Sequence, residues 1–95
     1  MFNNPRYCTC GISNELPLML QIILWGLIDT MEVAEKDYLQ VFCLSNESGK
    51  QKITHSQEQP EYSKEYLFPS EEPITAKIFV IDDETHTTML LAEEY

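Results

Sequence analysis

The hydrophobic pattern of the N-terminal third of the chain is that of a buried helix. Residues 16–31 place apolar side chains on nearly every helical face, and Pro17 stands where a first helical turn tolerates proline. We predict one long helix that begins near Ser13 and ends between Met31 and Val33. A surface helix normally carries one apolar stripe only. We therefore expect this helix to be covered on two sides, or to lie on a sheet and also contact a second chain.

The remaining apolar segments are typical of strands. They are short, contain β-branched and aromatic residues, and are bounded by Gly, Pro, Asn or acidic residues. The segment 51–57 is polar, and we expect one of its sides to face solvent. Residues 61–68 fit the helical and the strand period equally well. The predicted strands are residues 5–11, 38–44, 51–57, 74–81 and 86–92.

Connections between these strands are mostly short, which favours antiparallel pairing, because a parallel pair needs a crossover of about a dozen residues. The predicted fold is therefore a single α+β domain over residues 1–95, with one long helix packed on a four- or five-stranded antiparallel sheet in two layers. Residues 62–68 either fold over the helix and complete the core or leave its outer side uncovered.

Charge narrows the classes of function. The 95 residues include 6 Lys and Arg against 16 Asp and Glu, for a formal charge of −10. Direct nucleic-acid binding and attachment to an anionic membrane both need a basic surface, so both are disfavoured. The apolar segment Leu16–Ile28 is shorter than the roughly 20 residues of a bilayer span. No apolar run follows a basic start at the N-terminus, so we predict no signal peptide and a cytoplasmic location.

The leading hypothesis is a small acidic interaction or regulatory protein without enzymatic activity, which meets a protein partner through its acidic face, its helix or both. An apolar outer helix face with Leu18, Ile22, Trp25 and Asp29 would mark such a surface, including one for a homodimer. An alternative is an inhibitor whose carboxylates imitate the phosphates of nucleic acid. A solvated acidic surface without function is the simplest alternative. The candidate interaction residues are Glu71, Glu72, Asp82, Asp83, Glu84, Glu93, Glu94 and Trp25.

A third hypothesis is a small thiol- or metal-dependent enzyme. Cys43 and His55 on adjacent strands would form a nucleophile and base if their side chains met. Cys8 and Cys10 are too closely spaced for a typical zinc pair, and no second pair exists. Asp82, Asp83 and Glu84 lack the alternating ligands of a calcium loop. We predict three reduced cysteines and no catalytic, cofactor-binding or metal-binding residue.

Several blocks distributed over the whole chain carry a family resemblance. They are Met1–Gly11, Leu16–Asp29, Asp37–Phe42, Lys50–Glu58, Ile74–Asp82 and Ala92–Tyr95. Together they resemble a small family from staphylococci and related Firmicutes that is classified as a domain of unknown function, family 960. The resemblance implies a cytoplasmic bacterial protein, carried on mobile elements in some members. It assigns no catalytic residue.

Overall fold

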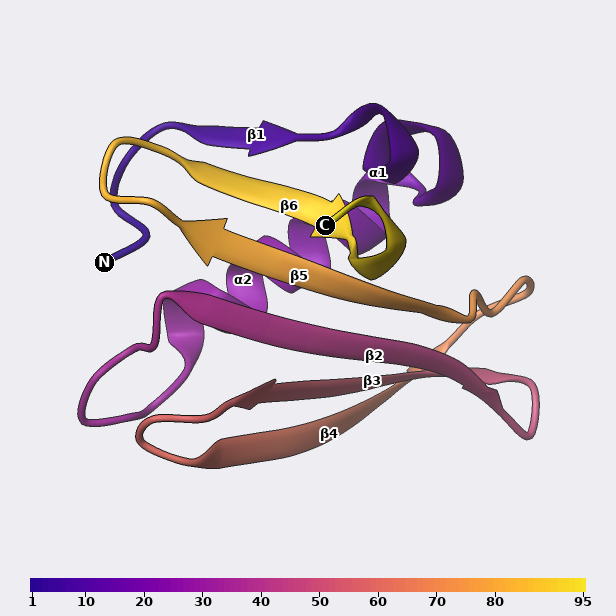
Figure 1. Cartoon of the computed structure of the whole chain (residues 1–95). Helices are drawn as coiled ribbons and strands as arrows, with labels where there is room; N and C mark the ends of the chain where they lie inside the picture. The colour runs from indigo at the N-terminus through magenta and orange to yellow at the C-terminus, as the bar shows by residue number, and fades with distance from the viewer.

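A six-stranded mixed sheet forms the body of the protein, and helix α2 lies across one face of it (Figure 1). The computed structural model describes all of residues 1–95. Along the chain the elements are β1 (Arg6–Cys8), α1 (Cys10–Glu15), α2 (Leu18–Thr30), β2 (Leu39–Glu47), β3 (Lys50–Gln57), β4 (Tyr62–Pro69), β5 (Ala76–Asp82), β6 (Thr87–Leu91) and the 3-10 turn η1 (Ala92–Glu94). Neither α-helix has the length and apolar character needed to cross a membrane.

The predicted fold class is wrong. The sheet has six strands in the order β1-β6-β5-β2-β3-β4, and β1 pairs with β6 in parallel. The rule of short connections missed this pair, because Arg6 lies opposite Thr87 at the other end of the chain. Sheet dominates the structure, and the longer of its two α-helices has only 13 residues, so it is not one long helix on an antiparallel sheet.

The single helix expected from Ser13 onward is divided at Pro17. Helix α1 begins earlier than expected, where the Thr9 side chain accepts a hydrogen bond from the Ile12 backbone N–H. It ends before Leu16, whose backbone is extended, with φ −106° and ψ 127°. A proline disfavours helical backbone in the residue before it. Pro17 therefore ends one helix and also precedes the first turn of the next.

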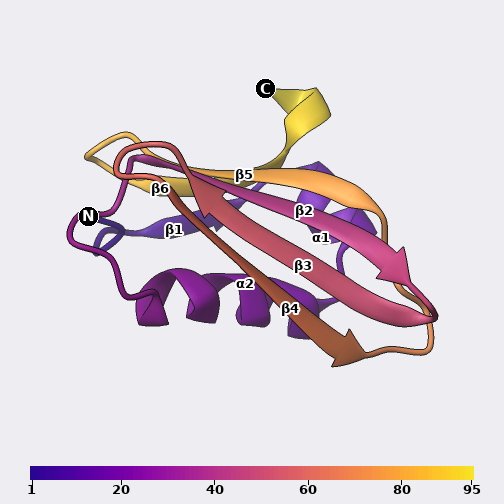
Figure 2. The same ribbon diagram turned by 90° about the horizontal axis from the view of Figure 1, so that it is seen from below.

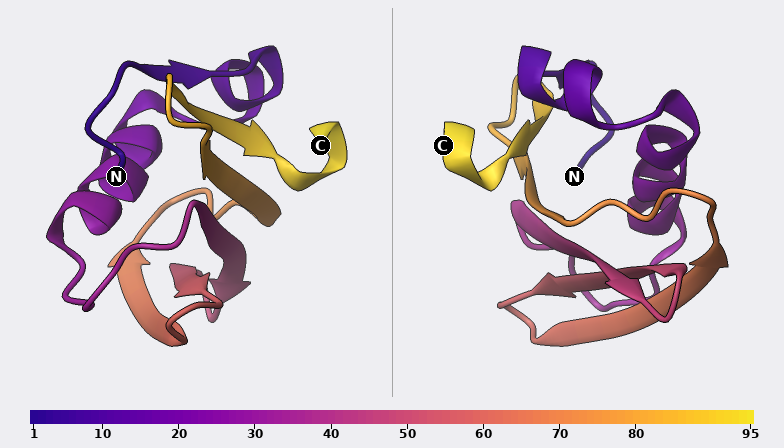
Figure 3. Two further views of the ribbon diagram at one scale, coloured as in Figure 1. Left: turned by 60° about the vertical axis from the view of Figure 1, so that its left-hand side comes forward. Right: turned by 90° about the vertical axis from the view of Figure 1, so that its right-hand side faces the viewer.

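The ambiguous segment 61–68 forms a strand. β4 pairs antiparallel with β3, with Tyr66 opposite Ile53, and it is the last strand of the sheet on that side. The other predicted strands are confirmed, with ends that differ by a few residues. The sheet is strongly twisted, so β3 and β4 turn toward the side on which α2 lies (Figure 3).

Helix α2 runs along one face of the sheet (Figure 2). It buries one stripe of side chains against that face. Leu20, Leu24 and Ile28 are buried at successive four-residue intervals, as one helical face requires. Each contributes about 1.5–3 kcal/mol to stability relative to an exposed position. The opposing sheet residues are Phe42, Leu44, Ile53, Ile78, Val80, Met89 and Leu91. The helix is thus covered on one side, and the expected second cover is missing from its first two turns.

Candidate functional site

The outer face of α2 exposes large apolar side chains. Leu18, Met19 and Ile22 are 69%, 68% and 54% exposed. No atom outside the helix backbone lies within 4 Å of the position that a Cβ on Gly26 would occupy, so the surface stays open there. We call Leu18, Met19 and Ile22 the α2 outer face. None of these three side chains is charged. In the isolated chain their apolar atoms are exposed to water.

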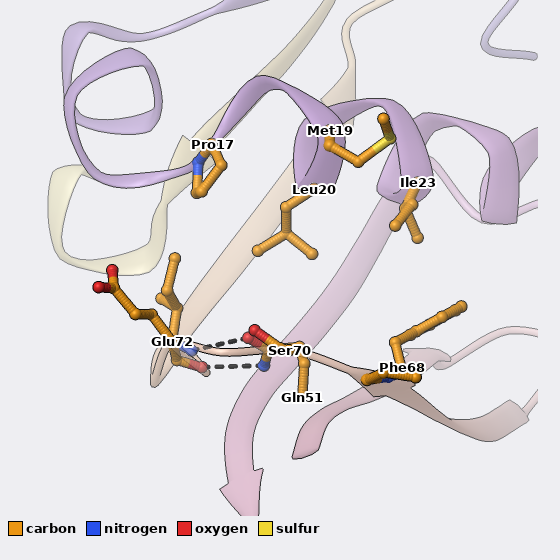
Figure 4. Close-up of a pocket in the computed structure, with 10 residues that line it drawn as sticks. Pro17, Met19, Leu20, Ile23, Gln51, Phe68, Ser70 and Glu72 are labelled. Atoms are coloured by element: carbon orange, nitrogen blue, oxygen red, sulfur yellow. Dashed lines mark hydrogen bonds between the residues drawn. The ribbon is translucent and has the colours of Figure 1, made fainter. Parts of the chain in front are cut away.

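A groove lies beside this face, between α2 and the edge strand β4 (Figure 4). Its volume is about 170 Å³. The helix supplies one wall and the end of β4 with the following loop supplies the other. We call it the α2–β4 groove, and its lining residues are Pro17, Met19, Leu20, Ile23, Gln51, Phe68, Pro69, Ser70, Glu72 and Ile74.

Gln51 fixes the loop that closes one end of this groove. Its side chain is buried, and its Nε2 donates to the Ile74 carbonyl oxygen at 2.9 Å. The Ile74 backbone N–H donates back to Gln51 Oε1 at 2.7 Å. The amide side chain thus pairs with a peptide group as a neighbouring strand would. These two hydrogen bonds hold the connection between β4 and β5, which forms one side of the groove (Figure 4).

Trp25, the one apolar member of the predicted interaction residues, is half-buried under Arg6. The guanidinium carbon of Arg6 lies 4.9 Å from the centre of the indole ring. Both guanidinium Nη atoms donate to the Asp29 carboxylate, Nη1 at 3.1 Å. This hydrogen bonding, followed by the charge of Arg6, lowers the pKa of Asp29. Trp25 is therefore tied to β1 and does not belong to the α2 outer face.

The predicted acidic interaction residues lie at two ends of the sheet. Glu71 and Glu72 precede β5, whereas the group Asp82–Glu84 ends it, so a full strand length separates them. Glu93 and Glu94 lie in η1, which follows β6. The end of β6 is beside the start of β5, so these two residues lie at the same end of the sheet as Glu71 and Glu72. The carboxylates therefore do not form one contiguous patch.

Asp83 accepts hydrogen bonds from its own turn, and two further acids, Asp82 and Glu94, bind segments near the chain termini. Asp82 is buried and accepts hydrogen bonds from the backbone N–H of Phe2 at 2.6 Å and from the Asn4 side chain at 2.9 Å. Burial alone would raise the pKa of Asp82, but these bonds and one from the Glu84 backbone together lower it. Glu94 accepts from the Thr9 hydroxyl at 2.7 Å, which lowers the pKa of Glu94. Both carboxylates hold terminal segments in place.

Cys43 and His55 do not meet. On paired strands β2 and β3, His55 is opposite Phe42 and Cys43 is opposite Thr54, so the two side chains lie on opposite faces of the sheet. Cys43 is exposed on the outer face, whereas His55 is fully buried on the inner one. No group of three or more His, Cys, Asp or Glu side chains has the geometry to hold a metal ion.

A buried polar cluster, which the sequence pattern did not predict, lies on the inner face of the sheet. His55 Nε2 lies 2.7 Å from Gln40 Oε1, and Gln40 Nε2 donates to Gln57 Oε1 at 2.7 Å. His55 also stacks on Phe42, with ring centres 4.4 Å apart, and its Nδ1 is buried without a hydrogen-bond partner. Burial lowers the pKa of His55 to about 4. The alternation of Gln51, His55 and Gln57 along β3 was the available signal, since these positions share one face.

Comparison with known proteins assigns the chain to a family. A family model described as "Staphylococcal protein of unknown function (DUF960)" matches residues 5–94. The chain belongs to this family. The resemblance seen in the sequence is thereby confirmed, and the DUF960 match includes both walls of the α2–β4 groove. No curated protein matches the sequence.

A solved structure supports the same fold for this DUF960 protein. A crystal structure of a protein of unknown function from Enterococcus faecalis is similar, with a TM-score of 0.86 and 28% sequence identity. The similarity covers 98% of this chain and 92% of that one. The six-stranded sheet with its helices is therefore not peculiar to one sequence.

Proposed function

We propose that this DUF960 protein is a small acidic interaction protein without enzymatic activity, which binds another protein through the α2 outer face. The observation that carries the proposal is the exposure of Leu18, Met19 and Ile22 within two helical turns. Large apolar side chains gathered on one surface are typical of protein interfaces. Its three cysteines are free, which favours a reducing compartment such as the cytoplasm.

The energetics of this face support an interface. Burying each of its side chains against a partner contributes about 1.5–3 kcal/mol. In the isolated domain they contribute little, because α2 already fills the core with Leu20, Leu24 and Ile28. Asp29 is the only charged residue of the helix, so a partner loses little solvation of charge when it covers the first two turns.

The overall charge of −10 selects among partners. Long-range attraction speeds the approach of a basic protein, and like-charge repulsion disfavours an acidic one. A nucleic-acid mimic would need its carboxylates along one face, but the candidate acids are divided between two ends, and Asp82 and Glu94 bind their own chain. A thiol enzyme based on Cys43 and His55 loses support because a sheet separates the two side chains.

Affinity capture with a matched pair of variants tests the proposal. Ile22→Asp places a charge on the α2 outer face, and Tyr38→Asp places one at a distant apolar residue of nearly equal exposure, 55% against 54%. We expect wild-type protein and Tyr38→Asp to retain the same partner, and Ile22→Asp to lose it. Sedimentation of the same proteins tells whether the partner is a second copy. Equal recovery of the partner by Ile22→Asp would contradict the proposal.

A further inference from the structure

β4 is an edge strand with one side unpaired. Its eight residues pair with β3 on one side, and no strand follows it in the sheet order. In an antiparallel ladder, alternate residues direct their backbone N–H and C=O groups away from the neighbour. The free side of β4 therefore presents a row of unpaired donors and acceptors, which is the template that strand addition uses.

The α2–β4 groove adjoins this template. Phe68 and Tyr66 occupy alternate positions on the side of β4 that faces the helix, with parallel rings 6.3 Å apart. Met19 and Ile23 form the opposite wall. An added strand would lie about 4.8 Å from β4, with every second side chain on the same face as Tyr66 and Phe68. Those side chains would point into the groove.

The size of the groove suits one large apolar side chain. Its volume is about 170 Å³, and an apolar cavity of about 150 Å³ is known to accommodate benzene. From the edge strand and the groove together, we infer that an extended segment of a partner protein pairs with β4 and inserts one large apolar side chain between Phe68 and Ile23. This inference rests on the proposed function and specifies how the partner binds.

The charges favour a cationic segment from another protein. Glu72 lines the groove, Glu61 immediately precedes β4, and the chain as a whole carries −10. A second copy is disfavoured, because two chains that each carry −10 repel each other. Antiparallel self-pairing centred on Lys64 or on Glu65 would in addition place two like charges directly opposite each other. Like charges directly opposite each other destabilise a strand pair. Lys64 thus protects the edge from self-association.

The probe is a peptide selected from a phage-displayed library of random linear sequences. The peptides are about 10 residues long, which is the upper end of ordinary strand length. We expect selected peptides to share apolar residues at alternate positions and a net positive charge. Methylating their backbone nitrogens one at a time should weaken binding about five- to tenfold at every second position only, since each affected bond is a single backbone hydrogen bond. A helical or irregular peptide would not show this period of two.

The protein side of the experiment uses neighbouring residues of α2. Met19 lines the groove and Leu18, equally exposed, does not. Aspartate is tolerated at both positions because they lie in the first helical turn. We expect Met19→Asp to weaken the selected peptides about tenfold or more. Leu18→Asp should change peptide binding by about twofold or less, because a short peptide held in the groove does not reach Leu18, which only the rest of a whole partner protein would cover. Bound peptide should slow amide exchange in β4 and leave the other edge strand, β1, unchanged.

Several results would overturn strand addition at β4. They are a failure to select any peptide, methylation effects without a period of two, an equal response to both variants, or competition between the peptides and self-association of the protein. Peptides that depend on Leu18 and Ile22 but not on Met19 would overturn it and still support binding at the α2 outer face. Failure of the capture experiment with Ile22→Asp is a separate outcome that contradicts the proposed function itself.

Discussion

Gln40 determines which nitrogen of His55 carries a proton. An amide oxygen only accepts hydrogen bonds, and Gln40 Oε1 lies 2.7 Å from His55 Nε2, so Nε2 is the donor. In the neutral ring Nδ1 is then a bare acceptor, and it is buried without a partner. Protonation would place a positive charge beside Phe42 with no acceptor for the new N–H. The cluster is therefore built for neutral imidazole.

This arrangement predicts a loss of stability in mild acid. Burial lowers the pKa of His55 from 6.5 to about 4, so below pH 6.5 the unfolded chain binds a proton that the folded chain does not. The contribution of neutral His55 to the free energy of unfolding is complete above pH 6.5. It is lost as the pH falls from 6.5 toward 4, by about 3 kcal/mol in total. Urea unfolding of wild type and His55→Gln at several pH values measures it. Parallel pH profiles for the two proteins would refute this role of His55.

A second prediction concerns the close contact between Gly11 and Glu94. A Cβ on Gly11 would lie 2.6 Å from Glu94 Oε1. Alanine there displaces the carboxylate from the Thr9 hydroxyl and the Leu91 N–H, so we expect Gly11→Ala to lower the free energy of unfolding by about 1–2 kcal/mol. Gly26→Ala is the matched control in open space within α2, and it should be neutral or stabilising by about 0.5–1 kcal/mol. Equal effects of the two substitutions would contradict the contact.

The third prediction concerns Arg6 over Trp25. Arg6→Ala removes the cation from the indole ring and the ion pair with Asp29, so we expect about 1 kcal/mol of lost stability and a red shift of Trp25 fluorescence. Asp29→Asn leaves Arg6 above the ring and should change the fluorescence little. A comparable red shift in both variants would contradict this, because it would mean that Arg6 leaves the indole ring when its ion pair with Asp29 is lost.

The local sequence pattern was sufficient to predict where the strands lie, but not which strands pair with each other. Alternation and composition predicted β2, β3, β5 and β6 because each depends on its own residues. The pairing of β1 with β6 joins Arg6 to Thr87, and no local signal carries such a contact. At Pro17 two local rules conflict, since proline suits a first helical turn and also disfavours helix in the residue before it. The extended backbone of Leu16, the residue before Pro17, shows that the second rule prevails here.

The candidate site was predictable only in part. The excess of apolar residues in α2 predicted either a second cover for the helix or an uncovered face with Leu18 and Ile22, because one helix can bury only one stripe against a sheet. The sequence did not decide between these two outcomes. The groove was not predictable, since it requires the twist that brings Phe68 of β4 opposite Ile23. Trp25 was expected on the open face, but Arg6, which is 19 positions away in the sequence, covers it.

The last prediction tests whether Gln51 holds the loop between β4 and β5, which lines the groove, independently of the hydrophobic core. Gln51→Ala leaves both the N–H and the carbonyl oxygen of Ile74 without their partner, so we expect a loss of about 1–3 kcal/mol in stability. Gln51→Glu retains the acceptor for the Ile74 N–H, but its carboxyl can donate to the Ile74 carbonyl oxygen only while it is protonated. We therefore expect the loss of stability to be intermediate at a pH where the carboxyl is protonated and to increase when it is charged. Amide exchange should accelerate at Ile74 in Gln51→Ala while Leu24, in the middle of α2, stays protected. Unchanged exchange at Ile74 would mean that the loop keeps its place without Gln51, because only that side chain binds the Ile74 peptide groups across the 23 positions that separate them.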